Sequence, residues 1–141
     1  MSLQQGVNQL LGMSAATLRL SPNFEERTQL QGLNRKIGAL DKVGKKETKQ
    51  FGYKALNVPK SEEAKDVPYA THKARSERAV QRADLLSQIA DIRPSTRTTI
   101  NARRAKTMAM EQLHEKLSEK LIQKADFDDL MNRLTGGKDG K

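Results

Sequence analysis

The chain has 141 residues, with 26 Lys+Arg against 17 Asp+Glu and no cysteine. Without cysteine it can form no disulfide, no cysteine-based zinc site and no thiol nucleophile. Leu, Ile, Val and Phe make up about a fifth of the chain, close to the composition of disordered proteins. Because these residues are nevertheless grouped periodically, we expect an all-α protein. It would have about four elongated helices, a thin core, and full order only with a partner or as an oligomer.

The positive charge is concentrated in the first two thirds of the sequence. Residues 1–60 carry a net charge of +6, residues 61–110 carry +4, and residues 111–141 carry −1. Such a field attracts polyanions, nucleic acid and anionic membranes among them. A solvated helix face that only keeps the protein soluble explains the same charge, and the sequence leaves both readings open.

The first predicted helix spans residues 2–20 and has no charge before Arg19. An uncharged amphipathic segment of this kind is expected to dock on protein, because helices at a membrane surface usually carry Lys and Arg on their polar face. No signal peptide is expected, since no basic side chain precedes the apolar residues. No transmembrane helix is expected either. The predicted protein-interface residues are Leu3, Val7, Leu10, Leu11 and Leu18.

A second helix is predicted over 22–44, which completes an N-terminal helical segment, 1–44. Ser21 can cap it and Pro22 suits its first position. Its apolar stripe runs from Leu30 to Leu40, and three internal glycines should make its end fray. Residues 45–68 show no convincing period and contain six lysines, so we predict a flexible basic linker there.

The region 69–135 is predicted to be a helical hairpin or long-helix region. One helix should run from residue 69 and end before Pro94, and a long second helix should run from about 98 to 134. Gly136 and Gly137 are expected to stop it, and residues 136–141 to form a flexible tail.

Nothing in the sequence points to a reaction, and we expect no enzyme, cofactor, metal or small-molecule substrate. "KQFGYKAL" at 49–56 resembles an RNA-recognition strand, but the partner strands are missing, which leaves Phe51 and Tyr53 either to stack on bases from a flexible basic segment or to pin the linker onto a neighbouring helix. "GALDKVGKKET" at 38–48 lacks the spacing and hydroxyl of a P-loop. His72 and His114 have no second ligand at helical spacing and are expected to be exposed.

Basic clusters are the remaining functional candidates. "IRPSTRTTINARRAK" at 92–106 combines guanidinium groups, hydroxyls and a predicted helix start, which suit a phosphate backbone without sequence preference. Pairing of these arginines with acidic groups of a partner protein is an equal alternative. The predicted nucleic-acid-binding residues are Arg93, Arg97, Arg103, Arg104, Lys106, Lys45, Lys46, Lys49 and Lys54.

The layout of the chain resembles small accessory open reading frames of bacteriophages, those of microvirus type above all. The resemblance is carried by "MSLQQGVNQLLGMSAATLRLSP", "RTQLQGLNRKI" and "NARRAKTMAMEQLHEKLSEKL". It implies a virion or assembly component, located in the virion or the cytoplasm. We therefore expect a structural or assembly protein that binds protein or itself and contacts nucleic acid through a basic surface. A protein–protein adaptor and a membrane-surface protein are the alternatives.

Overall fold

The computed structural model describes residues 23–136, and every regular element in this range is helical. The all-α prediction is therefore confirmed. The predicted helix over 2–20, its interface residues and the Ser21–Pro22 start of the next helix lie outside the described residues. The elements are α3 (Phe24–Phe51), α4 (Tyr53–Asn57), the short 3₁₀ helix η1 (Glu62–Asp66), α5 (Tyr69–Ile92), α6 (Thr96–Ser118) and α7 (Lys124–Thr135).

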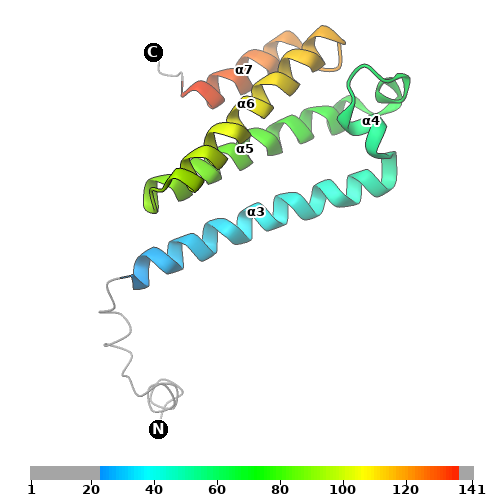
Figure 1. Ribbon diagram of the computed structural model, residues 1–141. Helices are drawn as coiled ribbons and strands as arrows, with labels where there is room; N and C mark the ends of the chain where they lie inside the picture. Colours follow the sequence, from blue (N-terminus) through cyan, green and yellow to red (C-terminus); the bar gives the residue numbers. More distant parts are fainter. Residues whose placement is uncertain (1–22, 137–141) are drawn as a thin grey trace.

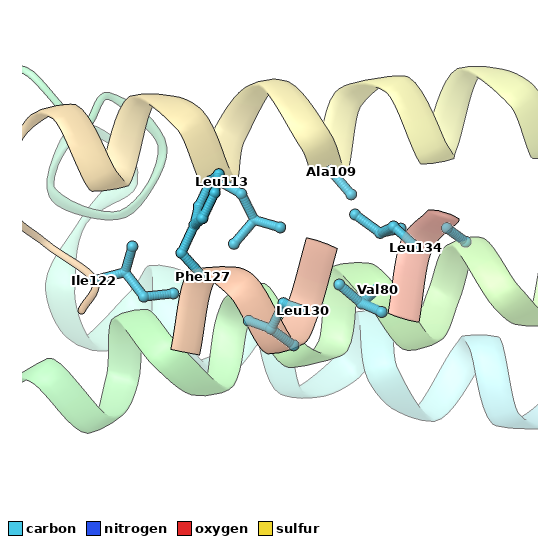
Figure 2. Close-up of a cluster of buried hydrophobic side chains, with 8 residues drawn as sticks. Val80, Ala109, Leu113, Ile122, Phe127, Leu130 and Leu134 are labelled. Carbon is cyan, nitrogen blue, oxygen red and sulfur yellow. The ribbon is translucent and has the colours of Figure 1, made fainter. Parts of the chain in front are cut away.

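Helix α5 is the central element, with α3 on one side and α6 and α7 on the other (Figure 1). It forms the predicted hairpin with α6, and α7 folds back over both helices. The main core fills the space between these three helices (Figure 2). It consists of Val80, Ala83, Ala109, Leu113, Ile122, Phe127, Leu130 and Leu134.

A second, smaller core joins α3 to α5. Leu33 and Ile37 of α3 are buried against Leu85, and partly buried apolar side chains of both helices surround them. Helix α5 therefore buries apolar residues on two sides. Burial on both sides is what allows α5 to separate α3 from the other long helices.

The linker predicted over 45–68 is wrong over most of its length, because α3 continues past Gly44 to Phe51 and both α4 and η1 follow within the same range. Three of the six lysines that suggested a linker, Lys45, Lys46 and Lys49, are exposed on this helix, while its opposite face packs on α5. Gly52, with φ of +95°, then turns the chain into α4. A third small core of Ala55, Leu56 and Val67, with Phe51 packed against it, holds α4 and the following segment.

Most predicted helix ends are confirmed. Helix α5 begins at Tyr69 after Pro68 and ends at Ile92, two residues before Pro94. Gly136 ends α7 with φ of +73°, in the left-handed conformation that glycine adopts without strain. Within residues 23–136, no helix combines the length and apolar character needed to cross a bilayer.

The predicted helix over 98–134 is broken in the structure. Helix α6 ends at Ser118 with Lys120 at φ of +62°. The N–H of Leu121 donates to the carbonyl of Lys116 at 2.7 Å, and that of Lys120 to the carbonyl of Leu117 at 3.1 Å. These are the two bonds of a Schellman ending, in which the left-handed position is usually glycine. The break lets Leu121 and Ile122 become buried.

Lys120→Gly is expected to raise the free energy of unfolding by about 1 kcal/mol, because the left-handed conformation strains a residue with a Cβ atom. The same substitution at exposed Lys106, inside α6, should lower it by roughly 0.5–1 kcal/mol. Urea denaturation of the two variants measures both effects. Changes of the same sign would show that residue 120 is not held in this turn.

Candidate nucleic-acid interface

Acidic side chains of α3 form ion pairs with arginines of α5 along their whole contact. Helix α3 carries four acidic and seven basic side chains, and three of the acids take part. Of these three, the acid nearest the start of α3 pairs with the arginine just after α5, as expected for antiparallel helices. The pairs are Glu26–Arg93 at 2.6 Å, Asp41–Arg82 at 3.0 Å, and Glu47 with both Arg75 at 3.2 Å and Arg78.

These pairs leave a row of exposed cations on the other face of α3, which we call the α3 basic stripe. It consists of Arg35, Lys42, Lys46 and Lys49, whose spacings of seven, four and three residues place them on one helical face. None of the four is in an ion pair within residues 23–136. The stripe extends over about 21 Å at 1.5 Å per residue. Its positive charge is therefore continuous and available to an anionic partner.

Beside the stripe lies an open groove between α3, α4 and α5, with a volume of about 690 Å³. Lys45 and Lys49 line it from α3, and Tyr53 and Asn57 from α4. On the α5 side it is lined by Arg75, Arg78 and Arg82, the same arginines that pair with α3.

The structure separates the two basic clusters that the sequence predicted. Lys45, Lys46 and Lys49 lie on α3, and Lys54 is exposed on α4. The other cluster lies on and just before α6, beyond α5 (Figure 1). Its members that stay exposed and outside any ion pair in the described part of the chain are Arg97, Arg103, Arg104 and Lys106.

The predicted phosphate site at the start of α6 is partly occupied by the chain itself. Arg93 is held by Glu26, as described above. The Ser95 hydroxyl accepts a hydrogen bond from the Thr98 N–H at 3.0 Å, and the Ser95 N–H donates to the Thr98 hydroxyl at 3.1 Å. This capping box satisfies amide groups that a phosphate would otherwise bind. Arg103 and Arg104 line a shallow groove further along α6, together with apolar side chains.

A buried ammonium group lies between the end of α6 and the start of α5. Lys116 of α6 is only 4% exposed, and its Nζ donates to the Ser76 Oγ at 2.7 Å and to the His72 carbonyl at 3.1 Å. No carboxylate lies within ion-pair distance of it in the described residues. Burial lowers the pKa of Lys116 from 10.5 to about 8, helped by the nearby cations Arg75 and Arg78.

His72 is buried beside this lysine, contrary to the expectation that it is exposed. Its Nε2 lies 2.7 Å from the Ala64 carbonyl, so this nitrogen carries the proton and donates it, while Nδ1 has no hydrogen-bond partner among the described residues. Burial is the main cause of its lowered pKa. His114 is exposed as predicted and packs edge-on against Phe127, with ring centroids 5.1 Å apart.

Lys116 and His72 are buried and hydrogen-bonded within the bundle. A depressed lysine pKa can mark a nucleophile, but only where a substrate can reach the amine. No described groove is lined by Lys116 or His72. Within residues 23–136, no group of three or more side chains is arranged to hold a metal ion. The exposed cations are therefore the stronger functional candidates.

Sequence reasoning missed two members of the stripe and the three α5 arginines of the groove. Arg35 and Lys42 lie at helical spacing from Lys46 and Lys49. This signal was missed because residues 45–68 were assigned to a linker. Arg75, Arg78 and Arg82 follow one another at three- and four-residue steps, which predicts one basic face of α5. Nothing in the sequence of α5 by itself indicates that these arginines pair with acidic side chains of α3.

Comparisons with known protein families, with curated proteins and with solved structures give no match for this chain. Its function is therefore argued from the geometry of the described residues.

Proposed function

We propose that this protein is a non-enzymatic binding protein that contacts nucleic acid through the α3 basic stripe, without reading its sequence. From the resemblance to phage open reading frames, we further propose that it acts in a structural or assembly role, with protein partners or copies of itself. The observation that carries the proposal is that three acids of α3 are neutralised by arginines of α5 and its end, while the outer face of α3 carries a row of four exposed cations outside any ion pair in the described residues.

The arrangement of the charges favours α3 over α6 as the surface that contacts nucleic acid. The stripe contains no acidic side chain, and its four cations follow one line along the helix. On α6, Arg97 and Arg104 share a face, but Lys106 is nearly on the opposite side, exposed Ile100 lies between the arginines, and exposed Met108 follows Arg104 by one turn. A backbone of regularly spaced phosphates is matched better by an unbroken row of cations than by charges distributed around a helix.

The test compares two variants with the same change in charge. One replaces Arg35, Lys42, Lys46 and Lys49 with glutamine, and the other replaces Arg97, Arg103, Arg104 and Lys106 with glutamine. Each lowers the net charge from +9 to +5, since four charges are removed. Glutamine keeps a helix propensity close to that of lysine and arginine, so both helices should persist.

The α3 variant is expected to bind oligonucleotides roughly thirtyfold more weakly at low salt, whatever their sequence. This follows from four lost contacts at about 0.5 kcal/mol each. The α6 variant should lose much less, and fluorescence anisotropy measures both affinities. Equal losses would mean that only net charge matters. Absence of binding by the unmodified protein would contradict the proposal and favour the adaptor, while binding confined to anionic vesicles would favour a membrane surface.

A further inference from the structure

Tyr53 stands out because its aromatic side chain is 70% exposed, the highest exposure of any large apolar side chain in the described residues. The chain turns sharply at Gly52, where φ is +95°, so that Tyr53 begins a new helix at the end of α3. Phe51, two residues earlier, packs against the small core of Ala55, Leu56 and Val67. The turn thus divides the two aromatic residues between a structural role and an exposed position.

Tyr53 lies in the wall of the groove between α3, α4 and α5. The lining of this groove also includes the apolar residues Leu40 and Ala79, together with Gly44, where even an added Cβ atom would meet no atom within 4 Å. Its volume of about 690 Å³ falls within the range of sites that hold small organic groups. A flat apolar ring can therefore enter the groove and face Tyr53.

The charges around the groove indicate which chemical groups would accompany a ring bound there. Lys45 and Lys49 are exposed at its α3 side, and Lys49 also belongs to the basic stripe. The acidic residue in the lining, Asp41, is paired with Arg82 at 3.0 Å. A groove that combines an exposed aromatic side chain with lysines on its α3 side and arginines on its α5 side complements a chain that alternates flat rings and phosphates.

We propose that this groove binds single-stranded nucleic acid, with a base stacked on Tyr53 and the adjoining phosphates on Lys45 and Lys49. This inference rests on the proposed function, to which it adds the class of nucleic acid. Bases in a duplex are already stacked and paired, so they cannot present a face to Tyr53. Stacking on an aromatic side chain beside a basic track is the usual mode of binding single strands without sequence preference.

The test measures the affinity of the full chain for a thymidine oligonucleotide and for a duplex of equal length at one low salt concentration. Tyr53→Ala is expected to weaken binding of the single strand by about tenfold and to change duplex binding by less than about twofold. Tyr53→Phe should retain the affinity of the unmodified protein, because the ring remains. The melting temperature should be unchanged in both variants, since the side chain is exposed.

A fluorescence measurement gives an independent readout. The chain has no tryptophan, so Tyr53→Trp introduces a single indole at the site. Its emission should be quenched by the thymidine oligonucleotide, and much less by the duplex. Equal quenching by both forms would contradict stacking of an unpaired base at this position.

Three results separate this inference from the proposed function. If the α3 glutamine variant loses affinity while Tyr53→Ala binds the single strand normally, the groove inference is wrong and the basic stripe stands. Equal losses of single-strand and duplex affinity in Tyr53→Ala would also overturn it, because stacking is specific to unpaired bases. If the α3 glutamine variant binds both forms like the unmodified protein, the proposed function fails and this inference fails with it.

Discussion

Lys116→Met is expected to raise the free energy of unfolding at pH 7 by on the order of 2–3 kcal/mol. Lys116 is buried, no carboxylate of residues 23–136 is in ion-pair range of it, and its pKa is lowered from 10.5 to about 8. A pKa lowered by this much means that the charged form of Lys116 destabilises the folded protein by about 3 kcal/mol relative to the neutral form. Methionine fills a similar volume without charge, and the Ser76 hydroxyl can turn to another acceptor.

The gain in stability of Lys116→Met over the unmodified protein should disappear at high pH. Below pH 8 the ammonium is charged in both the folded and the unfolded chain, so the full cost is present. Between pH 8 and 10.5 the folded protein has lost this proton while the unfolded chain still binds it, so stability rises with pH. Urea denaturation at several pH values should show the unmodified protein approaching the stability of Lys116→Met.

A matched control is Lys106→Met, at an exposed position of the same helix. It should change stability by less than about 0.5 kcal/mol and leave the pH dependence as it is. A difference between Lys116→Met and the unmodified protein that stays constant from pH 7 to 10 would contradict the burial of the charge. So would a loss of stability in Lys116→Met at pH 7.

Replacing Gly32, Gly38 and Gly44 with alanine together is expected to raise the free energy of unfolding by about 2–3 kcal/mol. All three glycines lie inside α3, and a Cβ atom added at any of them meets no atom within 4 Å. Alanine is favoured over glycine inside a helix by roughly 0.8–1.0 kcal/mol per position, mainly because the unfolded chain loses freedom. Thermal denaturation followed by circular dichroism measures the gain.

Gly52→Ala provides the opposite control. Nothing obstructs a Cβ atom there either, but φ is +95°, a conformation that strains alanine. It should therefore lower stability by about 1 kcal/mol or more, even though the substitution is the same. If the triple variant were no more stable than the unmodified protein, α3 would not be the continuous helix described here.

The sequence predicted the helical class and most helix ends because these depend on local signals. Apolar residues at helical spacing, Pro68, Pro94 and Gly136 all act within a few residues of their own position. The end of α6 was missed because Lys120 adopts a conformation usually reserved for glycine, while Leu117 and Leu121 continue the helical period. Burial of Leu121 and Ile122 against the rest of the protein favours the break.

The candidate site was predicted only in part, because it depends on contacts between distant segments. Lys45, Lys46 and Lys49 were recognised as basic residues, yet the pairing of α3 with α5 was needed to show which face of α3 stays positive. The burial of Lys116 was not predicted. One signal was present: Ala109, Leu113 and Lys116 follow one another at four- and three-residue steps, so the lysine lies on the buried face of α6.

The most direct test of the central claim is the salt dependence of oligonucleotide binding by the unmodified protein and the two glutamine variants. If the α3 basic stripe binds the backbone, log affinity falls linearly with log salt concentration, with a slope of about −3 for a single strand when four phosphates are neutralised. The α3 glutamine variant should lose most of this slope, and the α6 glutamine variant should keep it. Equal flattening in both variants would contradict the account.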